Sequence, residues 1–189
     1  MHRHKGCLHA YWSYELWGQR PRWHPSYGFV LQFLQVLDAN TRGVAITILP
    51  ESGAAQSWIA GADFRLDAPT GEDNCGIVVG TGTTAEANAD RALVTKIVEG
   101  VGVGQLTHGT QAFVAVAIVG ANVDFVFTRP FTNNSGGNIT VQEIGMFAGE
   151  ATNIPTTATN ALMCRDLTGA IVHVNGTTRT GQYTWRTTV

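Results

Sequence analysis

The chain has 189 residues and a formal net charge of -2. This length suits one ordinary domain with an appendage and is too short for two full-sized domains. Only 14% of the residues are charged, well below the usual quarter, so the surface must depend on Thr, Asn, Gln and Gly. The near-neutral charge gives no electrostatic reason to expect nucleic-acid binding or attachment to anionic membranes.

Targeting segments and cysteine chemistry also give no strong signal. The basic start from His2 to Lys5 runs into Trp, Tyr, Glu and Arg instead of an apolar core, so we expect no signal peptide. No stretch approaches the length of a membrane span. Cys7, Cys75 and Cys164 form no Cys-x-x-Cys pair, which indicates neither a disulfide framework nor a thiolate zinc site. We therefore expect synthesis in a reducing cytoplasm.

Residues 1–27 form a compositional island with three of the five tryptophans and four of the six histidines. Pro21 and Pro25 disfavour a continuous helix in it. We predict an extended docking arm that becomes ordered only against another subunit, followed by one domain over residues 28–189. The alternative is that its aromatic side chains fold back onto the core of the same chain. The residues expected to dock are Trp12, Tyr14, Trp17 and Trp23.

The remaining chain predicts a mainly β domain. The apolar run after Gly28 fits either a helix or a buried strand, and helix is preferred. Short segments rich in Val, Ile, Phe and Thr follow, each bounded by Gly, Pro or Asn, which is typical of strands and turns. They cover residues 44–49, 76–79, 113–119, 123–128, 139–147, 170–174 and 182–187. We expect an antiparallel β-sandwich with one short helix inserted.

The inserted helix is expected at Ala85 to Glu99, because this stretch is rich in Ala and charged residues. Residues 100–109 and 149–160 are rich in Gly or in Thr and Asn, and both are predicted to be exposed loops.

Two local features are predicted within the strands. Asn175 and Gly176 suit a type I′ turn, in which both central residues need positive φ, so they should join the last two strands. The apolar phase slips between Val141 and Ile144, which predicts a β-bulge near Glu143 with Gly145 as its glycine.

Gly80 and Gly82 belong to the most suggestive chemical motif, a Gly-Thr-Gly-Thr-Thr run that follows apolar residues 77–79. With the expected helix and Glu99 downstream, it has the outline of a dinucleotide fingerprint. The spacing to Glu99 is slightly short, however, and no further βαβ unit follows. We therefore interpret the two glycines as a turn between a strand and a helix and expect no cofactor.

Two groups of residues have metal-compatible side chains. The N-terminal group is His2, His4, Cys7 and His9. The acidic group is Asp63, Asp67, Glu72 and Asp73. The first shows little sign of rigidity and the second matches no EF-hand spacing, so we expect neither to hold a metal. His108 and His173 are isolated and are interpreted as ordinary surface or core residues, and no catalytic constellation is predicted.

Residues 76–186 nevertheless carry a pattern that resembles a known module. The pattern is Gly76-Ile-Val-Val-Gly-Thr-Gly-Thr-Thr, Asp90-Arg-Ala-Leu, Phe131-Thr-Asn-Asn-Ser-Gly-Gly-Asn-Ile-Thr-Val-Gln-Glu-Ile-Gly-Met-Phe, Leu162-Met-Cys-Arg-Asp and Tyr183-Thr-Trp-Arg. It resembles tail-fibre, collar and other structural proteins of tailed bacteriophages, where a Gly-Thr-Gly-type turn precedes a short Asp-x-x-Leu helix and an Ile-x-Glu-Ile-Gly strand follows. The resemblance covers somewhat over half of the chain, while residues 1–75 match nothing similar.

This resemblance implies a virion structural protein, not an enzyme, that works by assembly with other virion proteins. The scarcity of charge that could keep copies apart adds the expectation of a homo-oligomer. One alternative is a glycan-binding adhesin in which Trp58 or Trp185 stacks on sugar rings. Another is a nucleotide-dependent or hydrolytic enzyme, which depends on the Gly80 turn alone.

Overall fold

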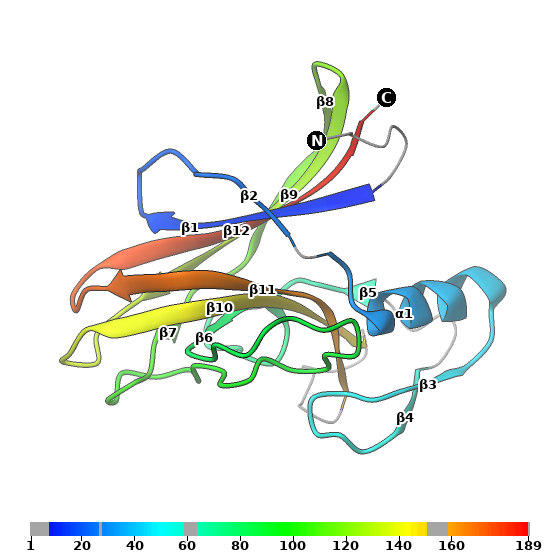
Figure 1. Cartoon of the computed structure of the whole chain (residues 1–189), viewed down its shortest axis with the longest axis horizontal. Helices are drawn as coiled ribbons and strands as arrows, with labels where there is room; N and C mark the ends of the chain where they lie inside the picture. Colours follow the sequence, from blue (N-terminus) through cyan, green and yellow to red (C-terminus); the bar gives the residue numbers. More distant parts are fainter. Residues whose placement is uncertain (1–7, 27, 59–63, 151–158, 189) are drawn as a thin grey trace.

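The computed structural model describes residues 8–26, 28–58, 64–150 and 159–188. Its strands form two antiparallel sheets that pack against each other, with a small third sheet and one helix beside them (Figure 1). The predicted mainly β, antiparallel sandwich is confirmed.

Sheet A has six strands in the order β2-β1-β12-β9, and β7 and β8 both pair with the remaining edge of β9. Its members are β1 (Leu8–Leu16), β2 (His24–Pro25), β7 (Thr107–His108), β8 (Ala112–Val119), β9 (Asn122–Thr132) and β12 (Thr178–Thr188).

Sheet B pairs β11 with β10, and β5 and β6 lie along the other edge of β10. Its members are β5 (Phe64–Arg65), β6 (Gly76–Gly80), β10 (Ile139–Glu150) and β11 (Asn160–His173). The third sheet is the hairpin of β3 (Ile46–Ile48) and β4 (Gln56–Trp58). All seven strands predicted from the sequence are present, although β11 begins much earlier than expected. Strands β1, β2, β4, β5 and β7 were not predicted.

The core lies between the facing sides of sheets A and B. Sheet A contributes Trp12, Tyr14, Phe127, Phe131 and Tyr183, and sheet B contributes Ile77, Val79, Val141, Ile144 and Met146. A smaller apolar cluster of Val30, Val78, Leu93, Phe147 and Leu162 lies apart from this core. Strands β6, β10 and β11 bury almost every side chain over much of their length, so sheet B is the most deeply buried part of the fold.

Helix α1 (Leu31–Arg42) confirms the helical interpretation of the apolar run after Gly28. Phe33, Val36 and Ala39 recur on one face of α1 and are buried, as expected for an amphipathic helix. The helix ends where Gly43 adopts a φ of 68° and donates its N–H to the Ala39 carbonyl at 3.0 Å.

The helix predicted at Ala85 to Glu99 is absent, and this segment is an irregular loop along sheet B. Helix propensity is a weak preference that tertiary contacts override. Here the backbone groups are bound by distant residues. The carbonyl of Thr95 accepts the N–H of Thr81, and the N–H of Thr95 donates to the Glu143 carboxylate. The Asp-x-x-Leu helix implied by the phage resemblance is therefore also absent.

The prediction of an N-terminal docking arm is wrong for residues 8–16. These residues form β1, which pairs with β12 along its whole length. Trp12 and Tyr14 point into the core and are 5% and 2% exposed, whereas Trp17 and Trp23 remain on the surface. A domain boundary after residue 27 therefore does not exist, because β1 is an integral strand of sheet A. Residues 1–7 lie outside the described residues.

The turn at Asn175 and Gly176 joins the last two strands, as predicted, but it is not a type I′ hairpin. Only Gly176 has positive φ (78°), and the N–H of Thr177 bonds to the carbonyl of Val174. Positive φ at the third position alone is typical of a type II turn. The turn also passes from sheet B to sheet A, so the strands that it joins do not pair with each other.

The irregularity predicted near Glu143 is present, with its extra residues on the partner strand. Residues 168–170 of β11 lie opposite Gln142 alone, between two regular stretches of the ladder. Gly145 belongs to the regular part. A Cβ there would lie 2.6 Å from Cδ1 of Leu93 and 3.0 Å from the Cys164 carbonyl oxygen, so close packing, not positive φ, requires this glycine.

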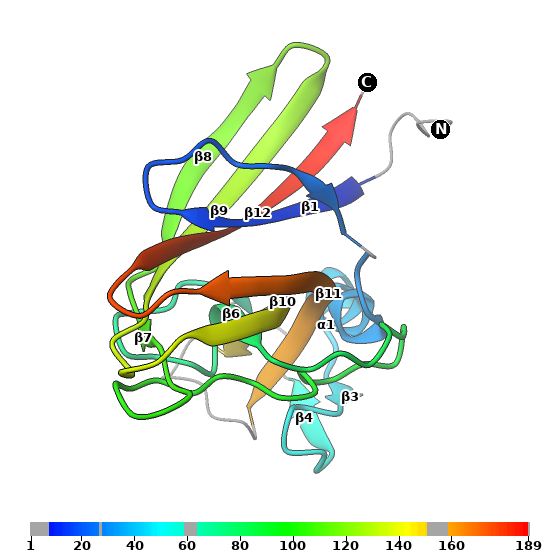
Figure 2. The same ribbon diagram turned by 60° about the vertical axis from the view of Figure 1, so that its left-hand side comes forward.

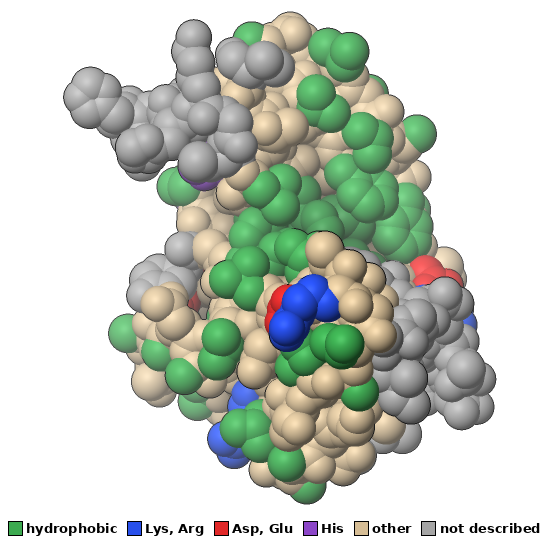
Figure 3. All heavy atoms as spheres, turned by 90° about the vertical axis from the view of Figure 1, so that its right-hand side faces the viewer, with side chains coloured by type: hydrophobic (Ala, Val, Ile, Leu, Met, Phe, Trp, Pro, Cys, Tyr) green, Lys and Arg blue, Asp and Glu red, His purple; other side chains and the backbone are tan. Residues whose placement is uncertain are grey.

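One part of sheet A extends past sheet B. Figure 2 shows the β8-β9 hairpin and the end of β12 projecting away from β10 and β11. We call this projection, the β8-β9 hairpin with the end of β12, the arm. On the side of the molecule that faces the viewer in Figure 3, hydrophobic side chains form a band over the surface. The arm is therefore the place where the sandwich lacks a second layer in the described structure.

Candidate functional site: a buried ionic network

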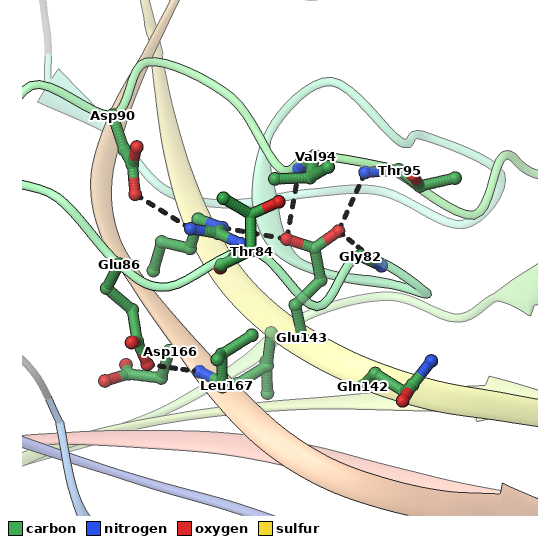
Figure 4. A network of polar contacts seen from close by, with 12 residues as sticks. Gly82, Thr84, Glu86, Asp90, Val94, Thr95, Gln142, Glu143, Asp166 and Leu167 are labelled. Atoms are coloured by element: carbon green, nitrogen blue, oxygen red, sulfur yellow. Dashed lines mark hydrogen bonds and ion pairs between the residues drawn. The ribbon is translucent and has the colours of Figure 1, made fainter.

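Glu143 lies at the centre of a buried polar network (Figure 4). Its Oε1 accepts hydrogen bonds from the backbone N–H groups of Gly82 at 2.9 Å and Thr95 at 2.8 Å. Its Oε2 accepts from the N–H of Val94 at 3.0 Å and from Nε of Arg165 at 2.8 Å. A carboxylate has about four acceptor positions, and four donors occupy them here. Glu143 is therefore engaged in structure, with no free lone pair for proton transfer.

Arg165 extends the network from β11 to the loop that precedes Leu93. Its Nη1 lies 2.9 Å from Oδ2 of Asp90, and its Nη2 donates to the carbonyl of Thr84 at 2.8 Å. Asp90 in turn accepts the N–H of Ala87 at 2.9 Å. Burial disfavours the charged guanidinium, but hydrogen bonds to Glu143 and Asp90 outweigh it and raise the pKa of Arg165. The side chain therefore stays charged and ties two strands to the loop.

Gly80 and Gly82 are needed because the network approaches their backbone closely. A Cβ at Gly80 would lie 2.5 Å from the carbonyl oxygen of Thr95 and 2.6 Å from Oε1 of Glu143. A Cβ at Gly82 would lie 2.6 Å from the Cβ of Val94. The interpretation as a turn into a helix is wrong, because no helix follows. The dinucleotide outline also fails here, since that motif needs a helix N-terminus after the glycines and Glu143 already takes the N–H of Gly82.

The network brings together residues that are far apart in the phage-like pattern. The contributing residues are Gly80, Gly82, Asp90, Glu143 and Arg165, and Gly145 packs beside them. All of them stand in the phage-like pattern, but the pairing of Glu143 with Arg165 was not predicted. The available signal was Glu143 within the apolar segment 139–147 and Arg165 directly after the apolar run 161–164, since a buried charge needs a partner.

Arg129 on β9 forms a second buried anchor, which the sequence analysis missed. Its Nη1 donates to the carbonyls of Ile77 at 2.9 Å and Cys75 at 3.1 Å, and its Nε donates to Gly109 at 2.8 Å. Its Nη2 donates to the carbonyl of Glu72. Burial lowers the pKa of Arg129 to about 10, so it remains a cation at neutral pH. It ties sheet A to β6 and to the loop before it.

Tyr14, predicted to dock to a partner, is instead bound inside the chain. Its hydroxyl lies 2.8 Å from Nδ1 of His173, whose Nε2 lies 3.0 Å from the carbonyl of Thr177. Nε2 must carry the proton to bond a carbonyl, so Nδ1 accepts from Tyr14. Burial raises the pKa of Tyr14, which keeps this donor protonated. His108, expected in a loop, lies on β7 and is also buried.

The acidic group does not form one site. Asp67 pairs with Arg65 at 2.6 Å, while the carboxylate of Glu72 accepts the N–H of Asn74 and that of Asp73 accepts the N–H of Glu99. Asp63, His2, His4 and Cys7 lie outside the described residues. Across residues 8–26, 28–58, 64–150 and 159–188, no three His, Cys, Asp or Glu side chains are grouped to hold a metal. The helix in this part of the chain is too short and too polar to cross a membrane.

Trp17 and Trp23 are the predicted docking residues that remain accessible. They are 68% and 46% exposed, in and beside the turn that joins β1 to β2. Trp17 lines a shallow hollow of about 390 Å³ together with Pro21, Thr128 and Gln182. Trp12 lies behind this region, stacked on His24 with ring centroids 4.4 Å apart.

Comparisons of the chain with family models, with curated proteins and with solved structures find no match.

Proposed function

We propose that this chain is a structural component of a tailed-phage virion, acting by assembly with other virion proteins and with copies of itself. The observation that carries the proposal is the ionic network around Glu143. Gly82, Asp90, Glu143 and Arg165, which belong to different parts of the phage-like pattern, meet in this one place, and the polar groups there hold strands and a loop together. Such a pattern fits selection for a rigid assembly unit.

Two surface features support the same function. Few charges oppose association, because only 14% of the residues are charged. Trp17 and Trp23 are large aromatic side chains left on the surface, and such residues are typical anchors of protein interfaces. Under this proposal the chain is made in the host cytoplasm and resides in the particle.

The test is to locate the chain in particles. Virions purified on a density gradient from lysed host cells would be probed with an antibody raised against the recombinant chain. We expect it to sediment with infectious particles and to resist a high-salt wash. Recovery of the chain only in the soluble fraction of the lysate would overturn the proposal.

A glycan-binding adhesin is the second candidate, supported by one hollow. Trp185, Phe113 and Phe125 line a cavity of about 300 Å³, with Arg65 and Asp67 at its edge. An aromatic floor beside polar groups suits a sugar ring. The other aromatic expected to stack on sugar, Trp58, is 1% exposed and cannot do so. Binding of bacterial envelope glycans that is lost in Trp185→Ala would favour this candidate.

A further inference from the structure

The arm has one face that continues the core side of sheet A. Strands β9 and β12 are in regular register there, so Phe125 and Val123 lie on the same face as the buried Phe127, and Trp185 lies opposite Phe125. On β8, Ile118 lies opposite Val123 and belongs to this face. We call these side chains, together with Phe113, the arm face: Phe113, Ile118, Val123, Phe125 and Trp185.

The arm face is apolar and is most exposed on β8, while Phe125 and Trp185 pack partly against the core. Ile118 is 81% exposed and Phe113 is 42% exposed. Trp185 lies edge-on to Phe33 of α1 with ring centroids 5.6 Å apart, which joins the arm face to the helix. The outer side of α1 carries Leu31, Leu34 and Leu37, which are all more than half exposed. In Figure 3, hydrophobic side chains form a band over one side of the molecule, beside one cluster of Lys or Arg and Asp or Glu side chains.

The area of this surface fits an interface of ordinary size. At the areas typical of such side chains, the arm face and the α1 leucines expose on the order of 600 Å² of apolar surface, which is at the upper end for a monomer. It is also close to the ~800 Å² per partner of a standard protein interface.

The charged side chains on the strands of the arm lie on its opposite face, and Arg65 and Asp67 at the edge of the arm face pair with each other. Residues 112–121 contain no charged side chain. Asp124 and Arg186 pair with each other at 2.6 Å and lie across the strands from the arm face, since they alternate with Phe125 and Trp185. Two arm faces brought together would therefore meet without charge repulsion.

Pairing by the free edge of β8 is opposed by the strand itself. Its register with β9 shifts between Val114 and Ala117, so β8 has one residue more than β9 there. Such a bulge interrupts the ladder and is a common protection of edge strands. Contact through the face requires no such ladder.

We propose that the arm face and the leucine row of α1 are the surface through which two copies of this chain associate. Each arm presents a partly uncovered apolar sheet face, and an identical arm supplies the missing layer at the usual ~10 Å spacing of packed sheets. Because both copies use the same largely apolar surface, the contact closes as a two-fold dimer. The inference rests on the proposed function in one respect: it identifies the surface through which copies of the proposed virion component would contact each other.

The experiment measures the association of the full recombinant chain by sedimentation velocity over a range of concentrations. Ile118→Glu places a charge on the arm face, and Val119→Glu places the same charge on the next residue, which points to the opposite face and is 53% exposed. We expect the unchanged chain and Val119→Glu to dimerise, and Ile118→Glu to raise the dissociation constant at least about tenfold. Near-identical thermal unfolding of the two variants at low concentration would show that both are folded.

A chain that stays monomeric at every concentration would overturn the inference, and the apolar face would then belong to a different protein. Equal weakening by both variants, or no weakening by Ile118→Glu, would also overturn it. The proposed function is tested separately, by sedimentation of the chain with particles. A monomeric chain that is found in virions would refute the dimer and leave the function standing.

Discussion

Glu143 on β10 and Arg165 on β11 form an ion pair with Nε 2.8 Å from Oε2, and their side chains are 0% and 1% exposed. The attraction within such a buried pair adds little net stability to the fold. Removing one partner costs much more stability, because the other charge is then left buried without a partner. The pair also positions the Gly80–Gly82 turn and residues 94 and 95 through the remaining lone pairs of the carboxylate. Changes at this pair should therefore disturb the fold over a wide region.

We predict that Glu143→Gln lowers the free energy of unfolding by about 3–5 kcal/mol, the usual cost of breaking a buried pair. The amide keeps the size of the side chain but presents an N–H₂ group to donors and leaves Arg165 paired only with Asp90. Urea unfolding measures the loss. Asp38→Asn, in the exposed pair with Arg42 on α1, is the matched control and should change nothing measurable. Equal effects of the two substitutions would contradict the assignment.

Gly145→Ala should destabilise the protein by about 1–3 kcal/mol, the usual cost of overpacking. The added methyl would meet Leu93 and the Cys164 carbonyl, and the latter cannot move without shifting β11. Gly137→Ala is the control, because a Cβ at that position meets nothing within 4 Å and the residue has no positive φ. It should be neutral or slightly stabilising. Thermal unfolding of both variants decides the matter, and a tolerated Gly145→Ala would be inconsistent with this packing.

Strands β6, β8, β9, β10 and β12 could be predicted because their sequences combine branched apolar residues with clear boundaries. The irregular structure of the segment from Ala85 to Glu99 could not be predicted. The residues that bind backbone groups in it and next to it, Glu143 and Arg165, come much later in the chain. Local propensity contains no information on such distant partners. The same applies to Arg129, whose acceptors are all carbonyls of other elements.

Strand β1 was missed although its signal is present. Ala10, Trp12 and Tyr14 alternate with His9 and Ser13, which is the period of a half-buried strand. The basic and aromatic composition of residues 1–27 outweighed this alternation and favoured an extended docking segment. Of the four residues predicted to dock, Trp12 and Tyr14 thus belong to the core, whereas Trp17 and Trp23 lie in or beside the following turn.

Stability should fall with acid because of His108. Burial, reinforced by the charge of Arg129, lowers the pKa of His108 to about 4. The unfolded chain takes up this proton near pH 6.5, whereas the folded protein resists it until about pH 4, so stability is lost as the pH falls between these values. The expected loss from this residue is on the order of 3 kcal/mol. Burial also lowers the pKa of His173, which adds a change of the same sign.

Comparison of the unchanged chain with His108→Leu from pH 7 to pH 4 measures this contribution. The free energy of unfolding of the unchanged chain should fall more steeply, because the variant lacks the group that the unfolded state protonates. Gly137→Ala, which changes no titratable group and meets nothing within 4 Å, serves as the control and should give a curve parallel to that of the unchanged chain. Parallel curves for the unchanged chain and His108→Leu would show that the histidine is not held neutral by the fold.

Trp17 and Trp23 should contribute to docking in the particle without contributing to the fold. The double variant Trp17→Ala, Trp23→Ala removes aromatic surface that lies outside the core, so its thermal unfolding should match that of the unchanged chain. Interface anchors of this kind are worth about 2 kcal/mol or more each, so its incorporation into particles should fall sharply. Trp12→Ala is the contrasting variant. It should lose about 3–5 kcal/mol of stability because it leaves a cavity in the core.

Deletion of residues 1–27 would not separate docking from folding, because it removes β1 and exposes one edge of β12. The point variants do separate them. Sedimentation of each variant with purified particles, together with its thermal unfolding, gives two independent readouts. A double variant that unfolds normally and is incorporated as well as the unchanged chain would refute the docking role of Trp17 and Trp23. A double variant that loses stability as Trp12→Ala does would instead place both side chains in the core of the folded chain.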